Sequence, residues 1–452
     1  MKLRRIHLST THMIMLSFLG LILLGSFLLA LPIATKSGEA VPYPDALFTA
    51  TTSACVTGLV TVSTAATWSV FGQIVILLLI QVGGLGVITV MTGFMLALNR
   101  KMGLSDRLLL QDAFNLNTLS GLIQFVKKVI LGTFFVEGAG ALLYMIVFVP
   151  KYGLAGIWYS IFNAVSAFCN AGMDLLGENS LADYVTHPLV GGVTSALVIL
   201  GGLGFIVWWD LISVFKDFGR KKLKCLRYLT LHSKIALVST AVLLFGGMLV
   251  FLVLEYDNPQ TLGELSFGGK LQASFFQSMT TRTAGFYTVS QPGLTQASAM
   301  VSIVLMLIGG SPVGTAGGMK TVTAVVLFAT ASSAIKNKNH VSLFGRRLSG
   351  EAVRKAVAVT VISLAVLLVS TVALLAVTDA SLTDVMYETA SAVATVGLTR
   401  DLTPTLDLAG KLIIIVTMYL GRVGHLSLAL AFNKKQENHN LICDPVEEIS
   451  VG

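Results

Sequence analysis

Four glycines recur at nearly equal intervals along the chain, and each ends a short motif whose backbone could hold a bare cation. They are Gly58, Gly172, Gly285 and Gly397, and the intervals between them are 114, 113 and 112 residues. Glycine accepts backbone conformations that a Cβ would resist, and rings of backbone carbonyls can replace the hydration shell of an ion. The pattern therefore predicts a filter for a monovalent cation, most readily K⁺, built from four equivalent loops.

The residues just before each glycine complete this predicted filter, because their carbonyl groups would supply further oxygens. The predicted ion-binding residues are Cys55, Val56, Thr57, Gly58, Cys169, Asn170, Ala171, Gly172, Thr283, Ala284, Gly285, Thr395, Val396 and Gly397. None of them is acidic, which argues against a Ca²⁺-type filter lined by carboxylates. Glycines in membrane helices also permit close helix packing, but that alternative is weaker for four glycines at matched positions.

The composition places these motifs in a membrane protein. Of the 452 residues, 54% are hydrophobic and only 12% are charged, whereas soluble domains carry about 25% charged residues. Many apolar stretches approach the roughly 20 residues that a helix needs to cross a bilayer. Five clear stretches cover residues 13–31, 74–98, 129–149, 235–254 and 357–377.

Each filter motif lies in a unit of the same design. An apolar helix comes first (about 13–31, 129–149, 235–254 and 357–377), a short helix ends at the glycine, and a second apolar helix returns (about 70–98, 190–215, 296–330 and 409–432). A stretch of roughly ten residues is too short to span a bilayer, so we read it as a re-entrant pore loop. Its partly negative C-terminal end would favour a cation.

The repeat predicts an all-α membrane protein with eight transmembrane helices and four re-entrant pore loops. They would form four parallel helix–pore loop–helix repeats with pseudo-fourfold symmetry about a shared axis. The predicted boundaries are 1–98, 99–215, 216–330 and 331–435 for the repeats, with a cytoplasmic loop before each of the last three, and 436–452 for a cytoplasmic tail. A secondary transporter would show inverted or twofold repeats instead.

The net charge of +8 follows the positive-inside pattern and does not indicate nucleic-acid binding. Of the 31 Lys and Arg residues, 23 lie in the N-terminal segment and four loop regions, namely 2–5, 100–128, 216–234, 336–355 and 434–435. This distribution places both termini and these loops in the cytoplasm. The opposite side is rich in acids, and an acidic mouth would concentrate cations. Contact with anionic lipid is one of two interpretations of these basic loops, and docking of a partner is the other.

A second group of residues could form a gate. The third returning helix is interrupted by a cluster of glycines and a proline, which break helices, and an arginine lies within the fourth. An intramembrane arginine is costly and usually faces the protein interior or water. The predicted gate residues are Gly309, Gly310, Ser311, Gly314, Thr315, Gly317, Gly318, Lys320 and Arg422. The alternatives are a passive kink, an arginine paired with an acid, and a snorkelling lysine.

Three further charged residues need partners within the apolar units. For Arg282 and Arg400, which flank the third and fourth filters, we expect a structural role through Glu388 or Asp401. Glu137 lies within an apolar helix, and we expect it to bond to a neighbouring pore helix, with a proton or Na⁺ relay as the alternative.

Several motifs resemble the superfamily of K⁺ transporters that includes KtrB, TrkH and the plant HKT proteins. They are CVTGL (55–59), SAFCNAG (166–172), FFQS…RTAGF (275–286), GGSPVGTAGGMKT (309–321) and GRVG (421–424). The likeness covers the whole chain, and eight spans favour the KtrB branch, the membrane subunits of bacterial Ktr systems. Thr281, His425 and Met173 depart from the residues common in that branch, but every filter glycine is present.

This resemblance implies function and partners. It implies K⁺ selection by the filter loops, since Na⁺-selective relatives place serine at the position of Gly58, and an intramembrane loop that obstructs the pore beneath them. It further implies a homodimer in the bacterial plasma membrane, possible Na⁺ activation, and a cytoplasmic ring of KtrA/KtrC-like RCK subunits that bind ATP or ADP. Segments 220–227 and 346–347 are candidate docking surfaces for that ring.

The chain itself should carry no cofactor and is not expected to be an enzyme. The sequence offers no closely spaced metal ligands, no nucleophile with a plausible base, and no phosphate-binding loop. The longest predicted cytoplasmic loop is about 30 residues. Any control by a nucleotide must therefore come from a partner subunit.

Overall fold

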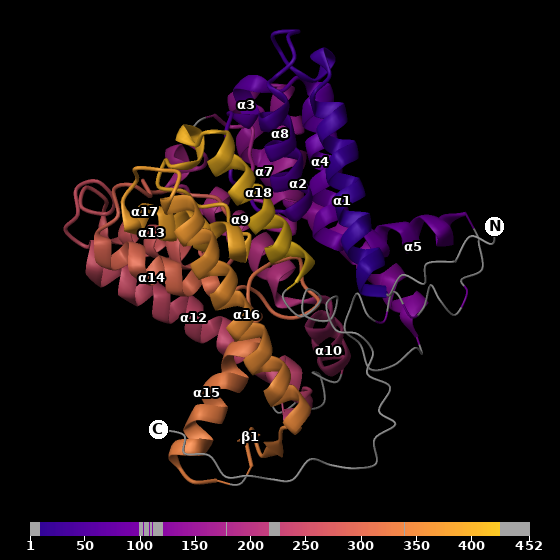
Figure 1. The fold of residues 1–452 in the computed structure, drawn as a ribbon, viewed down its shortest axis with the longest axis vertical. Helices are drawn as coiled ribbons and strands as arrows, with labels where there is room; N and C mark the ends of the chain where they lie inside the picture. Colours follow the sequence, from indigo (N-terminus) through magenta and orange to yellow (C-terminus); the bar gives the residue numbers. More distant parts are fainter. Residues whose placement is uncertain are drawn as a thin grey trace.

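The chain folds into helices in which the same order of elements recurs four times. The computed structural model describes residues 10–98, 121–177, 179–216, 227–338 and 340–424, together with Gly103, Leu108 and Gln111. In each round a long helix is followed by a short one (Figure 1). The long helices are α1 (Thr10–Leu29), α7 (Leu122–Tyr152), α12 (Leu231–Glu255) and α16 (Gly350–Leu375), and the short ones are α2 (Tyr43–Cys55), α8 (Ala155–Cys169), α13 (Phe267–Thr280) and α17 (Leu382–Ala394).

The returning segment is broken in the first three rounds, and in the fourth its described part is a single helix. Its pieces are α4 (Val70–Leu85) and α5 (Val87–Ala97), α9 (Pro188–Leu203) and α10 (Phe205–Phe215), α14 (Gln296–Leu307) and α15 (Thr321–Ile335), and α18 (Leu408–Val423). The first two pairs bend by 96° and 97°, and in Figure 1 α5 points away from the body of the molecule. The bends lie at Gly86 and Gly204, whose φ angles of 86° and 85° a continuing helix cannot contain.

Short elements connect these helices. Their bounds are η1 (Pro32–Ala34), α3 (Thr64–Thr67), η2 (Ala182–Tyr184), η4 (Thr403–Thr405), β1 (Ser342–Leu343) and β2 (Arg346–Arg347). The two strands pair antiparallel, with Ser342 opposite Arg347. Positive φ angles at Phe344 and Gly345 (48° and 72°) form the tight turn between them. This hairpin presents the exposed Arg346 and Arg347, which were predicted as part of a docking surface.

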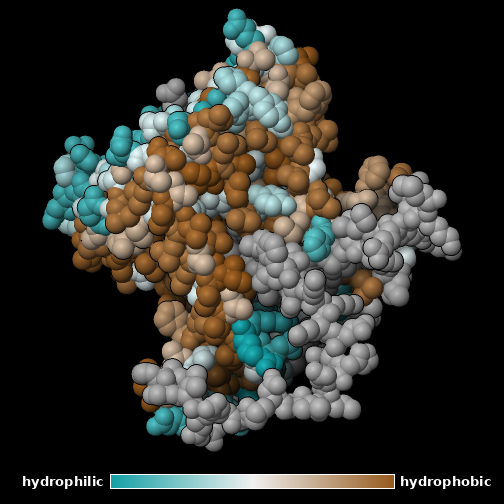
Figure 2. Space-filling model, in the orientation of Figure 1, coloured by the Kyte–Doolittle hydropathy of each residue, from teal (hydrophilic) through white to brown (hydrophobic). Residues whose placement is uncertain are grey.

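The outer surface matches a membrane environment. Among the described helices, four are long and apolar enough to cross a bilayer, or up to six if each bent pair is one span. Large apolar side chains point outward from the long helices, as Phe135 does with 77% of its surface exposed. Figure 2 shows apolar residues over most of the visible described face, with hydrophilic residues toward its margins. The helical class is confirmed, whereas the eight-span topology stays a prediction, because α14, α15 and α18 are each shorter than 18 residues.

The short helices form the core, and neighbouring repeats hold them in a ring. Each of α2, α8, α13 and α17 is buried over most of its length and packs on the long helix before it. Each also contacts the returning helix of the preceding repeat: α4 with α8, α9 with α13, α14 with α17, and α18 with α2. The last pair closes the circle, and a salt bridge of 2.5 Å between Lys411 and Asp45 joins the fourth repeat to the first.

Candidate functional site

The backbone after each short helix turns in a matched way. The residue two positions before each glycine has a left-handed conformation, with φ of 55° at Val56, 60° at Asn170, 62° at Thr283 and 51° at Thr395. The glycines themselves also have positive φ, namely 103°, 67°, 79° and 96° in chain order. Non-glycine residues rarely adopt such angles. Four valine, asparagine and threonine residues in this region therefore indicate a backbone shape that the surroundings impose.

The four glycines meet around one axis. A Cβ built on each glycine would collide with the carbonyl oxygen that precedes the glycine of the next repeat. These contacts join Gly58 to Ala171 (2.6 Å), Gly172 to Ala284 (2.8 Å), Gly285 to Val396 (2.6 Å), and Gly397 to Thr57. The order runs from the first repeat to the second, third, fourth and back to the first. The structure thus brings together the glycines and the residues immediately before them, all of which were predicted as filter residues.

Hydroxyl groups hold three of the four loops to their own short helices. The side-chain oxygen six positions before the glycine accepts a hydrogen bond from the loop backbone: Thr52 from Gly58 (2.9 Å), Ser391 from Gly397 (3.0 Å), and Ser166 from Met173 (3.1 Å). The third repeat has Met279 at this position. There, the Thr280 hydroxyl donates to the carbonyl of Phe286 instead. The third loop is therefore held differently from the other three.

Polar atoms without protein partners lie among the predicted filter residues. Within the described part of the chain, the Thr57 Oγ1, Asn170 Nδ2 and Thr395 Oγ1 atoms are buried and have no hydrogen-bond partner. Buried polar atoms are normally satisfied by protein, water or an ion. The two threonine hydroxyls can accept from water or contact a cation, and the asparagine amide can donate to water. Their chemistry therefore fits a hydrated or ion-bearing axis.

A cavity of about 640 Å³ opens on one side of the ring. Its lining includes all four glycines and residues that follow them in the chain, with the carboxylates Asp174 and Asp401 among them. Asp174 is 8% exposed and accepts a hydrogen bond of 3.0 Å from the Leu176 backbone. Burial raises the pKa of Asp174 to about 6. The cavity therefore has an acidic wall whose charge depends on pH near neutrality.

The segment 308–320 lies on the opposite side of the ring. It contacts residues that precede the glycines: the Thr315 hydroxyl donates to the carbonyl of Phe168 (2.9 Å), and the Gly317 amide donates to the Thr283 hydroxyl (3.2 Å). The segment also rests on the bend after α9, where the Ser311 amide donates to the Gly202 carbonyl (2.8 Å). All predicted gate residues except Arg422 lie in this segment, which we call the intramembrane loop.

Three cationic side chains donate hydrogen bonds to the intramembrane loop. Arg422 donates to the carbonyl of Thr315 (2.7 Å) and, on its other side, to the carbonyls of Gly83 (2.5 Å) and Gly84 (3.2 Å). Lys320 donates to Ala316 (2.7 Å). The third cation, Arg282, contacts the carbonyl of Gly309 at 3.4 Å. Within the described residues none of the three has a salt-bridge partner, so neutral oxygens face these cations and no carboxylate does.

Two of the expected pairings were wrong. Arg282 was expected to bond to Glu388 or Asp401, but besides Gly309 it contacts the hydroxyl of Thr240 (3.2 Å). Arg400 pairs with Asp384 at 2.7 Å and not with either expected acid. The expectation failed because these partners meet only through tertiary packing. The expectation for Glu137 fits better, since it lies 3.8 Å from the thiol of Cys169 on α8 and also accepts from Gln81.

Sequence reasoning missed a second repeated motif. It reads GGLG at 83–86 and 201–204, GGSP at 309–312 and GRVG at 421–424. The first glycine of the motif allows the returning helix to pack closely against the short helix of its own repeat. A Cβ at this position would collide with the carbonyl of Ala54 in the first repeat, Phe168 in the second and Val393 in the fourth. Arg422 therefore stands where the other repeats have Gly84, Gly202 and Gly310. The signal was present, but the motif follows the filter glycine at unequal distances.

Comparisons with known proteins agree with this geometry. A family model described as "TrkH: Cation transport protein" matches residues 9–442. The chain is 41% identical to the potassium/sodium uptake protein NtpJ of Enterococcus hirae, over 99% of this chain and 98% of that protein. It is 39% identical to the Ktr system potassium uptake protein B of Bacillus subtilis, over 94% and 93%. These matches confirm the resemblance inferred from the motifs.

A solved structure shares the fold. The potassium transporter TrkH from Vibrio parahaemolyticus superposes with a TM-score of 0.74 at 15% identity, covering 95% of this chain and 86% of that one. Nearly the whole chain thus takes part in the match, both in sequence and in fold. The chain belongs to the TrkH family of cation transport proteins, and it is a transport protein rather than an enzyme.

Proposed function

We propose that this chain is the K⁺-translocating pore subunit of a bacterial K⁺ uptake system. The observation that carries the proposal is the cyclic contact between each filter glycine and the carbonyl oxygen of the next repeat. Carbonyl rings of this kind suit a dehydrated monovalent cation. The names of the relatives, which refer to potassium uptake and to potassium/sodium uptake, support the same cargo.

In this proposal a K⁺ ion enters the acidic cavity, loses water as it meets the carbonyl oxygens of the filter residues, and leaves on the side of the intramembrane loop. Eight spans and four re-entrant loops would place the cavity outside the cell and the basic loops in the cytoplasm. The intramembrane loop and Arg422 would form the gate. Arg422 donates to the Thr315 carbonyl, and the Thr315 hydroxyl donates to the Phe168 carbonyl. These bonds would hold the loop below the ring, where it would obstruct an ion that leaves the filter.

Regulation would come from outside the chain. We propose a homodimer whose cytoplasmic face binds a ring of RCK subunits that carry ATP or ADP, and activation of uptake by Na⁺. The exposed hairpin β1–β2, with Arg346 and Arg347, is the described part of the candidate docking surface. The second candidate segment, 220–227, and the departure at His425 lie outside the described residues, except for Arg227.

Complementation of growth tests the proposed function. The chain is expressed in bacteria that lack their own K⁺ uptake, with the cognate cytoplasmic subunit, and growth is measured at decreasing K⁺ concentrations. We expect rescue at low K⁺ and uptake of Rb⁺ as a tracer, with faster uptake when Na⁺ replaces choline in the medium. If the chain reaches the membrane together with its partner and growth is not rescued, the proposal is wrong.

The proposed direction of entry makes a prediction about external pH. Because the pKa of Asp174 is raised to about 6, its carboxylate is charged at pH 7.5 and mostly neutral at pH 5. The attraction of the cavity for cations should weaken as the external pH falls through this range. We expect the KM for K⁺ uptake to rise at least about twofold between these pH values. Asp174→Asn should raise the KM at pH 7.5 and remove most of this dependence.

The control for this prediction is Asp257→Asn, because Asp257 is exposed and does not line the cavity. Its pH profile should match that of the unchanged chain. An Asp174→Asn variant that keeps the full pH dependence would show that another group is responsible.

A further inference from the structure

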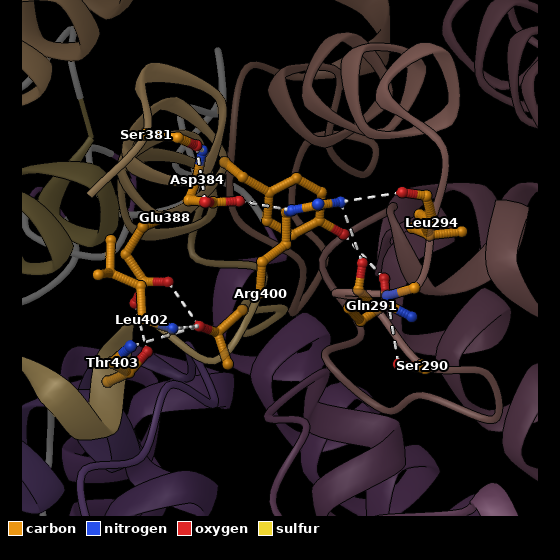
Figure 3. A network of polar contacts seen from close by, with 12 residues as sticks. Ser290, Gln291, Leu294, Ser381, Asp384, Glu388, Arg400, Leu402 and Thr403 are labelled. Atoms are coloured by element: carbon orange, nitrogen blue, oxygen red, sulfur yellow. Dashed lines mark hydrogen bonds and ion pairs between the residues drawn. The ribbon is translucent and has the colours of Figure 1, made fainter. Parts of the chain in front are cut away.

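The seam between the third and fourth repeats contains a polar network that leads away from the fourth filter loop (Figure 3). Arg400 lies three residues after Gly397. Its Nε donates to a carboxylate oxygen of Asp384 (2.7 Å), and its NH1 donates to the backbone carbonyls of Gln291 (3.2 Å) and Leu294 (3.3 Å). The guanidinium of Arg400 thus joins three parts of the chain: the segment after the fourth filter loop, the start of α17, and the segment after the third filter loop.

The side chain of Gln291 continues the network into both short helices. Its Oε1 accepts from the Tyr387 hydroxyl of α17 (2.8 Å) and from the Gln277 amide of α13 (2.9 Å). Its Nε2 donates to the Gln277 Oε1 (3.0 Å) and to the Val289 carbonyl (2.8 Å). Gln277 and Gln291 are each 2% exposed and Tyr387 is fully buried. Every donor and acceptor of the Gln291 amide is therefore used, and a fully satisfied buried network is rigid.

Hydrogen bonds to Glu388 hold the segment after the fourth filter loop from its other side. Thr399, which lies two residues after Gly397, donates through its hydroxyl to Glu388 (2.6 Å), and the Thr403 hydroxyl donates to the other oxygen of that carboxylate. Glu388 is fully buried on α17. The outer end of the fourth filter loop is consequently held by Thr399 and Arg400 together.

The third filter loop has a particular need for support from its neighbour. It is the loop in which Met279 replaces the hydroxyl that accepts from the backbone in the other repeats. The position ten residues before the glycine shows the complementary change. It is phenylalanine in the first three repeats and tyrosine only in the fourth, and the added hydroxyl is the group that reaches Gln291. The third repeat thus lacks one stabilising hydroxyl at Met279, and the fourth repeat supplies another at Tyr387. Together these two differences indicate that the third loop is supported by contacts between the third and fourth repeats.

We propose that Gln277, Gln291, Asp384, Tyr387 and Arg400, which we call the seam network, are positioning residues that set the preference for K⁺ over Na⁺. The network fixes the distance between the third and fourth filter loops, and the preference of a carbonyl ring depends on the number and placement of its oxygens. None of the five side chains is proposed to contact the ion. The inference rests on the filter proposed above and adds the residues that maintain the spacing of its loops.

The test is a Tyr387→Phe variant of the full-length chain, which removes one hydroxyl and keeps the ring that fills the core. Inhibition of Rb⁺ uptake by Na⁺ and by K⁺ is compared in cells that carry the partner subunit. We expect the ratio of the two inhibition constants to move toward Na⁺ by about fivefold, the factor that corresponds to one net hydrogen bond. The ratio is measured on molecules that work in the membrane, so a smaller amount of folded protein does not change it.

The matched control is Tyr144→Phe. Tyr144 is 1% exposed and its hydroxyl bonds to the Thr194 hydroxyl (2.6 Å), so the variant loses a comparable bond between α7 and α9 of the second repeat. Its ion preference should stay unchanged. An equal shift in Tyr144→Phe and Tyr387→Phe would overturn the proposal, because any loosening of the core would then suffice.

Three further variants test the network as a unit. Gln277→Met should change the ion preference in the same direction, and the double variant with Tyr387→Phe should change it by less than the product of the two factors, since both act through Gln291. Arg400→Lys should also shift the preference, because a lysine cannot reproduce the fork to Asp384 and the two carbonyls. Independent, multiplying effects would contradict the proposal.

The outcome separates this inference from the proposed function. If the unchanged chain takes up K⁺ and prefers it to Na⁺, while Tyr387→Phe and Gln277→Met keep that preference, the seam network is structural only and the pore proposal stands. If the unchanged chain transports no K⁺, the proposed function itself fails.

Discussion

Serine in place of Gly285 is expected to lower the preference for K⁺ over Na⁺ by about tenfold, since the strain of a non-glycine residue at positive φ is about 1–3 kcal/mol and 1.4 kcal/mol is a factor of ten. Gly285 has a φ of 79°, and a Cβ there would lie 2.6 Å from the Val396 oxygen and 2.8 Å from the Cα of Gly172. The neighbouring loops must move apart to admit it. A ring pushed apart no longer replaces the K⁺ hydration shell evenly, so K⁺ loses its advantage.

Gly58→Ser should act in the same way, because its added Cβ would lie 2.6 Å from the Ala171 oxygen at a φ of 103°. The measurement is the inhibition of Rb⁺ uptake by Na⁺ and by K⁺ in cells that express the partner subunit. Gly246→Ser is the control, since Gly246 lies on α12 with nothing within 4 Å of an added Cβ. Unchanged ion preference in both filter variants would defeat the assignment of the filter.

The four matched glycine loops, which we propose as the filter, could be predicted from sequence because they depend on local backbone shape. The four motifs align without gaps around a glycine, and the structure gives that glycine a positive φ in every repeat. A requirement for positive φ is written directly into residue type, so repetition of the glycine reveals it. The burial of the short helices follows from the small and aromatic residues that precede each glycine.

The bends of the returning helices were not predictable in the same way. Residues 74–98 form one apolar run, and hydropathy does not distinguish a straight helix from the 96° bend at Gly86. The only signal is the GGLG motif, which recurs at 201–204. It follows Gly58 and Gly172 at different distances, so an alignment centred on the filter glycines does not bring its copies together.

The partners of buried charges were the least predictable part of the site. The sequence indicated that Arg282, Arg400 and Arg422 lie in apolar units. Acids were the expected partners of Arg282 and Arg400, whereas for Arg422 an acid was the alternative to a role in the gate. The structure gives Arg282 and Arg422 backbone carbonyls, which become available where the helices break. A broken helix exposes carbonyl oxygens that no longer accept within the helix. Which arginine side chain reaches these carbonyl oxygens depends on how the four repeats pack together. Residue type alone does not reveal that packing.

Replacing Arg422 with glutamine should raise K⁺ uptake in the absence of the partner subunit by about tenfold or more, since hydrogen bonds to a charged group are each worth about 1.5–3 kcal/mol. Arg422 joins the Thr315 carbonyl of the intramembrane loop to the carbonyls of Gly83 and Gly84. Without the guanidinium, the loop loses its tie to the first repeat. The position also loses a positive charge below the filter, and both changes favour passage of a cation.

The variant Arg422→Lys separates these two causes. Lysine keeps the charge but is a point donor that cannot bridge both sides, so uptake like that of the unchanged chain would assign the barrier to charge, and uptake like that of Arg422→Gln would assign it to the bridge. Arg354→Gln, at an exposed position on α16, is the control and should leave partner-free uptake unaltered. An Arg422→Gln chain that reaches the membrane normally yet still needs its partner for uptake would rule out a gate at this arginine. Because glycine occupies the equivalent position in the other three repeats, the fourfold ring would then have to be gated by the intramembrane loop alone.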